Sequence, residues 1–417
     1  MTIIEFFDRT PIENIISSIT VEFNKIIFLG NGKMMDEFKD IYDEFLKKRE
    51  MKIEVRYRNI NRNNLQSIVD DLSEIVEEEE QCVFDLNGGE DLALVAMGIV
   101  YNKYSDKNIQ MQHFNINTNK VEDCDNDGMV VANKNPEITI DEIIGIHGGS
   151  IKYSKENAEN DIGTYKWDFS DDFINDIDVL WELCRNDPKK WNTELRVIER
   201  ICSMEHNKNA LSVTATYAEL EESFKNQTHN LVDITEILSN LQSNRLINGL
   251  FTKGESVSFT FKNKQIKKCL VKEGTVLELK VLTAASGATR KDGTKIYDEC
   301  MNGVVIDWDG GLHNETDTFN EIDIILRAGV NTIFISCKNG QIPQEELYKL
   351  DAVANEFGGE NVKKVLLATY LGKSDASKNR FVKRAEDMDI IFIDNVHQMR
   401  SAAFKGMVKN LINVKPN

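Results

Sequence analysis

The chain has 417 residues, of which 41% are hydrophobic and 5 are proline, a composition that excludes a disordered chain and predicts two or three folded units. Its formal net charge of −19 opposes non-specific binding to nucleic acid. The amino terminus lacks the basic and apolar segments of a secretory signal, and no stretch reaches the roughly 20 apolar residues that span a bilayer, which predicts a cytoplasmic protein with no membrane partner.

Apolar strand-like runs and amphipathic helical stretches alternate through residues 1–150. Short apolar runs predict strands, and apolar residues at every third or fourth position predict helices. In chain order these segments are Lys25–Leu29, Asp36–Lys48, Lys52–Arg56, Leu65–Glu77, Gln81–Asp85 and Asp91–Tyr104. Such alternation is typical of a parallel sheet covered by helices, so we expect an α/β, Rossmann-like domain.

Two glycine-containing loops follow predicted strands of this region and open onto predicted helices. They are Gly30-Asn31-Gly32-Lys33 and Asp85-Leu86-Asn87-Gly88-Gly89. Parallel α/β folds bind ligands at such positions, although paired glycines are also typical of tight turns. Neither loop has the spacing of a dinucleotide fingerprint or a Walker phosphate loop, so the sequence does not indicate NAD binding or ATP hydrolysis.

Short helices followed by a hairpin are predicted for residues 160–265. The expected elements are helices over Pro188–Met204, Tyr217–Phe224 and Ile234–Asn244 and a hairpin over Leu246–Phe261. Three helices and a hairpin indicate a winged-helix-like domain. The third helix of a DNA-reading example carries basic side chains, but this one has no Lys or Arg, which favours a linker or dimerisation role.

Mixed α/β structure returns in residues 266–417. The expected helices are Gly274–Ala285, Gln344–Phe357 and Ser377–Met388, and the expected strands are Ile322–Leu326, Thr332–Ser336, Val365–Thr369 and Ile390–Ile393. Residues 361–417 contain 11 Lys or Arg against 5 Asp or Glu. This end of the chain can therefore face phosphate, although an ordinary solvated surface explains the excess equally well.

Acidic and basic residues with a spacing suited to phosphodiester cleavage lie on two of these strands. Side chains at i and i+2 of a strand share a face, so Glu321 lies with Asp323 and Ser336 with Lys338. If the two strands pair, Asp323 and Lys338 project from the same edge of the sheet. The carboxylate can then hold a hard divalent cation while the lysine stabilises developing charge, and Glu278 in the preceding helix can supply a second acid.

These residues resemble a known family. Glu278, Asp323 and Ser336-Cys337-Lys338 resemble the PD-(D/E)xK superfamily. The runs Asn320–Asp323, Ile335–Gly340 and Glu346–Tyr348 resemble more narrowly the CARF-domain nucleases of type III CRISPR defence, and Asp85–Glu90 resembles the ligand loop of a CARF domain. The resemblance covers both ends of the chain.

The resemblance implies a CARF-like sensor domain over residues 1–150, a winged-helix-like linker over 160–265 and a restriction-endonuclease-like nuclease domain over 266–417. Mn²⁺ or Mg²⁺ is the implied cofactor, with Glu278 and Asp323 as its ligands. Cyclic oligoadenylate is the implied activator, and nucleic acid, DNA or RNA, is the implied substrate. The residues expected at the activator site are Thr10, Pro11, Gly30, Asn31, Gly32, Lys33, Asp85, Asn87, Gly88 and Gly89.

Ser336 departs from the superfamily pattern, which has Asp or Glu two residues before the lysine. A hydroxyl is a poorer ligand than a carboxylate for a hard cation. Either Glu321 or Glu346 supplies the missing acid, or water takes its place, or the domain is a weakened nuclease. The candidate catalytic residues are therefore Glu278, Asp323, Lys338, Ser336, Glu321 and Glu346.

We expect a homodimer in which two amino-terminal domains form one symmetric pocket for a cyclic oligoadenylate, with four adenylates favoured, because a twofold ring fits an isologous axis. Ligand binding then shifts the dimer toward a cutting state. Two alternatives are a ligand-independent DNA-repair or restriction endonuclease and a ligand-gated winged-helix regulator with a degenerate nuclease domain. Arg200 and His206 fall near the spacing of HEPN ribonucleases, but no other feature supports that chemistry.

Overall fold

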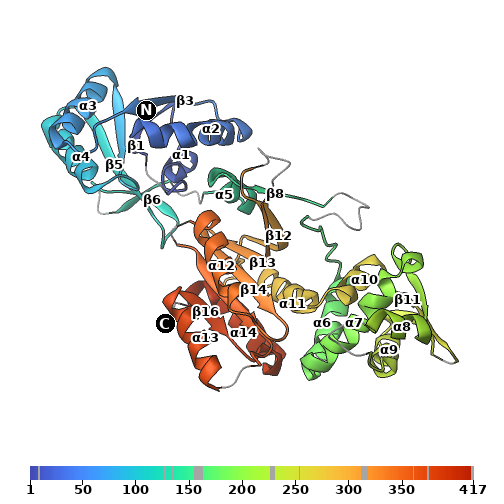
Figure 1. The fold of residues 1–417 in the computed structure, drawn as a ribbon. Coiled ribbons are helices and arrows are strands. Elements are labelled where there is room, and N and C mark those ends of the chain that lie inside the picture. The colour runs from blue at the N-terminus through green and yellow to red at the C-terminus, as the bar shows by residue number, and fades with distance from the viewer. Residues whose placement is uncertain are drawn as a thin grey trace.

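The computed structural model describes residues 1–7, 10–125, 128–132, 136–154, 163–225, 231–252, 254–310, 318–359, 361–372 and 375–414. Figure 1 shows three lobes, with the amino-terminal region in blue, the middle region in green and yellow, and the carboxyl-terminal region in orange and red. Within the described ranges, no helix combines the length and apolar character needed to cross a membrane.

The amino-terminal lobe is built on a seven-stranded sheet. Its strands are β1 (Thr2–Phe6), β2 (Lys25–Gly30), β3 (Glu54–Asn59), β4 (Gln81–Asp85), β5 (Asn108–Asn115), β6 (Lys120–Asp123) and β7 (Met129–Ala132), in the order β3-β2-β1-β4-β5-β6-β7. The first five are parallel, as the alternation predicts, and β6 and β7 add an antiparallel edge. Its helices are α1 (Ile16–Thr20), α2 (Gly32–Lys48), α3 (Leu65–Glu78), α4 (Asp91–Lys103) and α5 (Ile140–Ile146).

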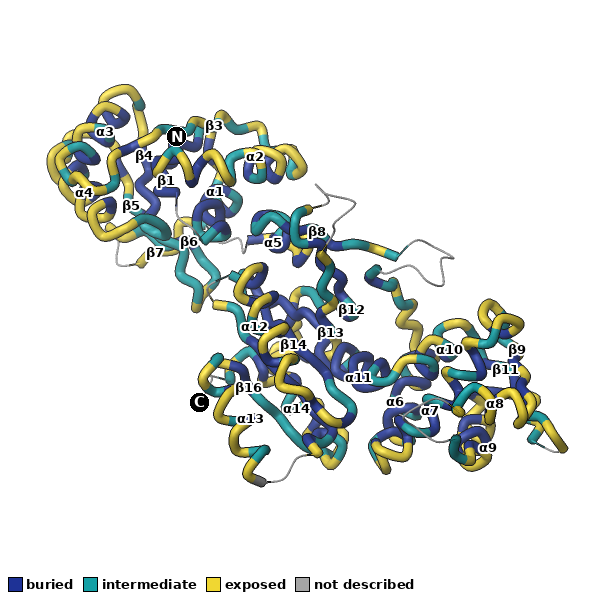
Figure 2. The backbone as a smooth tube through the Cα atoms, viewed as in Figure 1, coloured by how far each residue is buried: buried dark blue, intermediate teal, exposed yellow. Residues whose placement is uncertain are grey.

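The two faces of this sheet are covered by different helices. Apolar side chains of α3 and α4 form one core with β1, β2 and β4, and those of α2 and α5 form another on the opposite face. The central strands β1, β2 and β4 are consequently mostly buried, drawn dark blue in Figure 2, while the outward sides of the helices are exposed. The chain moves outward from β1 in one direction to β2 and β3 and in the other to β4 and β5, so the strand order reverses between β1 and β4.

The middle lobe contains the predicted three helices and hairpin, here α7 (Pro188–Ser203), α8 (Tyr217–Phe224), α9 (Thr235–Ser243), β10 (Ile247–Phe251) and β11 (Ser256–Phe261). A third strand, β9 (Ser212–Thr216), pairs with β11 and completes a small antiparallel sheet. Two helices not expected from the sequence flank this unit, α6 (Asp171–Asn186) and α10 (Lys264–Val271). The predicted domain boundary at residue 265 falls inside α10.

The carboxyl-terminal lobe has a six-stranded sheet in the order β16-β15-β14-β13-β12-β8. Its elements are α11 (Thr275–Ser286), β12 (Glu299–Asp307), β13 (Phe319–Ala328), β14 (Asn331–Lys338), α12 (Glu345–Phe357), β15 (Lys363–Ala368), α13 (Asp375–Asp387), β16 (Ile390–Ile393) and α14 (Ser401–Asn410). The predicted antiparallel pairing of β13 with β14 is present. Strand β8 (Ser150–Ile151) comes from the end of the amino-terminal region and pairs with β12.

Helix α5 joins the amino-terminal and carboxyl-terminal cores. Ile143 and Ile146 are buried in the core beside α2, whereas Ile140 and Ile144 are buried with β12, β13 and α12. The backbone N–H of Ile140 also donates to the Glu299 carboxylate, 2.7 Å away. A movement of α5 therefore disturbs both cores at once, because closely packed interiors transmit displacement.

Candidate functional site

The paired strands β13 and β14 bring Asp323 and Lys338 together. Asp323 Oδ2 accepts hydrogen bonds from the Cys337 backbone N–H at 2.6 Å and from Ser336 Oγ at 3.2 Å, and it lies 3.5 Å from Lys338 Nζ. The hydroxyl of Ser336 thus orients Asp323 across the hairpin. Ser336 stands where the superfamily pattern has an acid, and here it serves as a donor to the remaining acid.

Glu278 is the second acid of this cluster and is 5% exposed. It lies in the first turn of α11. This helix begins directly after Gly274, whose φ of +91° turns the chain into the helix. A Cβ on Gly274 would lie 3.4 Å from Glu278 Oε1, so the carboxylate folds back toward the helix start. Burial, and next the charge of Asp323, raises the pKa of Glu278 to about 8. Two acids that repel each other in a buried place form a site that a cation would stabilise.

Lys338 is held by carboxylates on two sides. Besides Asp323, it contacts Glu346 Oε2 at 2.9 Å, and Glu346 opens α12 after the lysine strand. Burial opposes the charged form of Lys338, but Asp323 and Glu346 outweigh it and raise its pKa above the usual value. The same ion pair holds the pKa of Glu346 below its usual value despite partial burial. Lys338 is therefore an ammonium at neutral pH.

Glu321 and an unpredicted lysine complete the cluster. Lys272 follows α10, and its Nζ lies 2.6 Å from Glu321 Oε1. Glu278 and Asp323 are also near enough to favour its charged form. Sequence patterns gave no signal for Lys272, because it lies outside the strand pair and has no spacing relation to it. The structure thus gathers all six candidate catalytic residues and adds a second lysine.

The donor set of this cluster fits a hard divalent cation. Glu278 and Asp323 offer carboxylate oxygens, and Mg²⁺ commonly binds through one or two carboxylates and completes its coordination with water. Among the described residues, no group of three or more acidic, histidine or cysteine side chains is arranged to hold a metal ion. A cation here would therefore depend on water for much of its coordination, as the serine at position 336 leads one to expect.

The raised pKa of Glu278 predicts a pH-dependent stability in the metal-free protein. Its pKa is about 8 when folded and near 4.5 when unfolded, so the folded state binds the extra proton between these values. Stability should fall as pH rises from about 4.5 through about 8, by up to about 5 kcal/mol, because each pKa unit corresponds to about 1.4 kcal/mol. Thermal unfolding in a chelator should show a smaller decline for Glu278→Gln than for wild type or for Glu345→Gln, a change at the exposed start of α12. An equal decline in all three would contradict the assignment.

Every residue predicted for the activator site lies at or just beyond the carboxyl end of a parallel strand in the amino-terminal lobe. Thr10 and Pro11 come after β1, Gly30 ends β2 and leads through Asn31 to Gly32 and Lys33 at the start of α2, and Asp85 ends β4 and leads into the loop of Asn87, Gly88 and Gly89. Asn31 caps α2 by accepting from the Lys33 N–H at 2.9 Å, and Lys33 is exposed beside this helix start. These loops therefore flank the point where strand order reverses, which is where α/β sheets bind ligands.

Asp85 lies beneath its loop rather than on the surface. It is 1% exposed, its Oδ1 accepts from the Asn87 N–H at 2.9 Å, and burial raises its pKa to about 7. Asn87 donates to Ser17 Oγ at 2.8 Å and accepts from the Phe114 N–H at 2.6 Å. These contacts fix the loop between α1 and β5, so Asp85 shapes the loop from below, while Asn87, Gly88 and Gly89 are half-buried.

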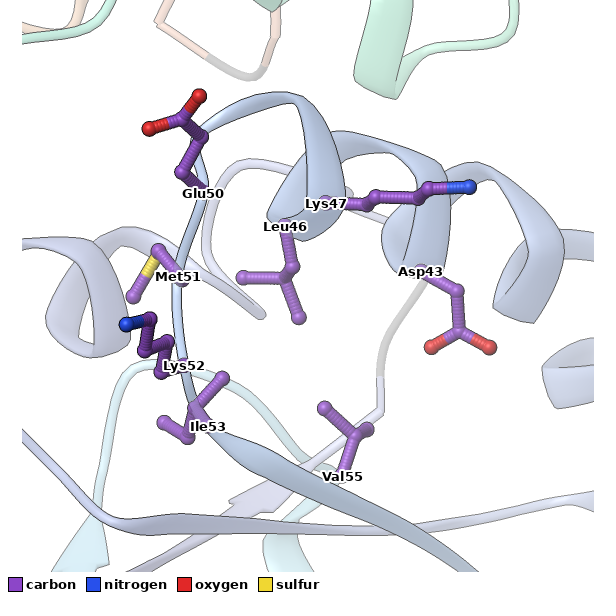
Figure 3. Close-up of a pocket in the computed structure, with 8 residues that line it drawn as sticks. All are labelled: Asp43, Leu46, Lys47, Glu50, Met51, Lys52, Ile53 and Val55. Carbon is purple, nitrogen blue, oxygen red and sulfur yellow. The ribbon is translucent and has the colours of Figure 1, made fainter.

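The hollow that the described residues form at the carboxyl edge of this sheet is too small in volume for a large ligand. A cavity of about 10 Å³ lies between the loops after β2 and β4, whereas small-molecule pockets usually measure some 300–1,000 Å³. A larger hollow, of about 580 Å³, lies between the end of α2 and the start of β3, at the opposite edge of the sheet (Figure 3). It is lined by Asp43, Leu46, Lys47, Glu50, Met51, Lys52, Ile53 and Val55. Among the described residues, the hollow at the predicted loops is thus smaller than a usual ligand pocket.

No protein-family model matches the sequence, and no curated protein matches it significantly. Two solved structures share the fold along the whole chain. Protein VC1899 from Vibrio cholerae is 15% identical with a TM-score of 0.73, covering 100% of this chain and 99% of that one. Can2 from Sulfobacillus thermosulfidooxidans, in complex with cyclic tetra-adenylate, is 15% identical with a TM-score of 0.67, covering 99% and 97%. These similarities confirm the predicted α/β fold class.

Proposed function

We propose that this chain is a nuclease of CRISPR defence that cuts DNA or RNA when a cyclic oligoadenylate, with cyclic tetra-adenylate favoured, binds its amino-terminal lobe. The observation that carries the proposal is the cluster of Glu278, Asp323 and Lys338 on a chain that also has a Rossmann-like lobe with ligand loops. The fold shared with Can2, a protein that binds cyclic tetra-adenylate, supports this combination.

The residues of the cluster divide the work of phosphodiester hydrolysis between them. Glu278 and Asp323 would hold Mn²⁺ or Mg²⁺, which when bound neutralises phosphate charge and lowers the pKa of a bound water. Lys338 presents an ammonium to charge that develops on the phosphate, and Glu346 restricts the ammonium to that direction. Ser336 keeps Asp323 in place from the neighbouring strand.

In a homodimer, the second copy would add a wall to the small hollow beside the ligand loops. Helix α4 begins directly after the loop at Gly89 and exposes several apolar side chains, Leu92, Leu94, Val95 and Ile99. These side chains stay partly exposed in the described part of the chain, and an exposed apolar helix face favours an interface with a second copy. A twofold axis beside this loop would place two copies of the ligand loops around one cyclic ring.

Val95→Asp should convert the dimer into monomer, because Val95 is 50% exposed on α4 and a charge would have to be buried there. We expect the dimer dissociation constant, measured by sedimentation velocity, to rise at least about tenfold. Phe251→Asp, at a side chain 49% exposed in the middle lobe, should leave the dimer unchanged. Dissociation by Phe251→Asp alone would place the interface in the middle lobe instead.

One assay tests the proposed function. The protein is incubated with labelled single-stranded and duplex DNA and RNA in manganese, without ligand or with cyclic tetra- or hexa-adenylate. Cleavage that requires a cyclic ligand is the expected result. Cleavage without ligand would indicate a constitutive endonuclease, and binding without cleavage would indicate a ligand-gated regulator; either outcome would overturn the proposal.

A further inference from the structure

Two lysines flank the acidic cluster, and they differ in how firmly they are held. Lys338 contacts two carboxylates, Asp323 and Glu346, and its side chain is 28% exposed. Among the described residues, Lys272 has one ion-pair partner, Glu321, and the two side chains are 53% and 42% exposed. An exposed pair of this kind contributes little to stability, so the ammonium of Lys272 can exchange Glu321 for another anion easily.

The charge around Lys272 explains why an anion-binding group is needed there. A nucleic acid strand that reaches Lys338 must approach the carboxylates of Glu321 and Asp323, which repel its phosphates. Burial opposes the charge of Lys272, but Glu278, Glu321 and Asp323 together keep its pKa above the usual value. A half-exposed ammonium at the solvent side of an acidic cluster is placed to offset that repulsion.

The backbone fixes where Lys272 can reach. It follows the last turn of α10 in an extended conformation, with φ −130° and ψ 119°, two residues before the turn that starts α11. Its helix belongs to the middle lobe, where Ile266, Cys269 and Leu270 are fully buried. The middle lobe therefore contributes a side chain to the cluster and is more than a spacer.

We propose that Lys272 is a substrate-binding residue that contacts a backbone phosphate of the nucleic acid strand beside the one that is cut, and that Glu321 holds its ammonium when no substrate is bound. This inference rests on the proposed nuclease function. Lysine suits the role because an ammonium binds a phosphate as a point charge, without requirements on base identity.

Binding of labelled single-stranded DNA and RNA, measured by fluorescence anisotropy over a range of salt concentrations, tests the proposal. Lys272→Met should weaken binding about tenfold and reduce the salt slope by about 0.7, the value of one phosphate contact on a single strand. Lys272→Arg should retain both values. Lys208→Met is a matched control, because Lys208 forms an exposed 2.6 Å ion pair with Glu205 away from the cluster.

The kinetic result separates this role from a structural one. Lys272→Met should raise KM about tenfold with little change in kcat, as expected for lost binding, while cyclic tetra-adenylate binding stays normal. Wild-type affinity with an unchanged salt slope in Lys272→Met, or an equal loss in Lys208→Met, would overturn the inference. If Asp323→Asn cut normally while Lys272→Met still lost affinity, the proposed catalytic site would be wrong, and the substrate-binding role of Lys272 would be retained. A wild-type protein that binds no nucleic acid would overturn both.

Discussion

Asp323→Asn should lower kcat for nucleic acid cleavage by at least about a thousandfold while leaving the fold and the binding of cyclic tetra-adenylate intact. An amide has the shape of the carboxylate and keeps one oxygen for the Cys337 N–H, which lies 2.6 Å away in the wild type. The negative charge is lost, however, and with it the attraction for a divalent cation and for Lys338. Single-turnover cleavage with saturating activator and manganese measures the effect.

A second Asp–Lys pair in the same lobe gives the control. Asp351 on α12 lies 2.7 Å from Lys364 on β15, and in the described part of the chain their side chains hydrogen-bond to each other and to Asn355. Asp351→Asn removes a comparable ion pair and should leave kcat within about threefold of wild type, because these hydrogen bonds do not involve the acidic cluster. Cleavage at the wild-type rate by Asp323→Asn would show that the catalytic centre lies elsewhere.

Local signals account for the elements that the sequence predicted well. Helix α8 matches its expected bounds, and a capping box formed by Thr216 and Glu219 marks its start. Helix α6 carries a comparable signal, since Phe173, Ile177, Leu180 and Trp181 recur at helical spacing, and it was predictable although it was not predicted. All five residues of strand β1 are buried, so the strand lacks the alternation of buried and exposed positions that marks a half-buried strand. A short run of this kind does not distinguish a central strand from another buried segment.

Long-range contacts explain what the sequence could not predict. Strand β8 has two residues and exists because β12 pairs with it from more than 150 positions away. The pairing of Asp323 with Lys338 was predictable, because a short turn joins their strands. Lys272 meets Glu321 only after α10, α11 and β13 have packed together, and no spacing along the chain encodes that meeting.

Contacts between the amino-terminal and carboxyl-terminal lobes reach the strands that carry the cluster. Asn119, in the turn between β5 and β6, accepts from the Val330 N–H at 3.3 Å, and Val330 lies in the turn that joins β13 to β14. Glu299, which accepts from the start of α5, lies 3.4 Å from Arg327 on β13. A ligand that moved the amino-terminal loops would therefore have two routes of direct contact to the hairpin of Asp323 and Lys338. Allosteric coupling requires a structural element whose conformation both sites influence. In the proposed activation, the hairpin of β13 and β14 would be that element for the ligand loops and the acidic cluster.

Gly89→Ala should shift the response to cyclic tetra-adenylate to concentrations at least about tenfold higher than wild type requires. Gly89 has φ +104°, a conformation that costs an L-residue about 1–3 kcal/mol, and an added Cβ would lie 2.9 Å from Phe6 Cβ. The loop after β4 would have to move away from β1, and with it the backbone proposed to contact the ring. Isothermal titration calorimetry should show at least about a tenfold loss of affinity.

Gly406→Ala on α14 is the control, because Gly406 lies in the carboxyl-terminal lobe and an added Cβ there meets nothing within 4 Å. This variant should bind the ring normally and gain about 0.5–1 kcal/mol of stability. Because Gly89 lies in a different lobe from Asp323, Gly89→Ala should still bind nucleic acid like wild type, which distinguishes a lost input from a damaged catalytic site. Wild-type affinity for the ring in Gly89→Ala would remove this loop from the activator site.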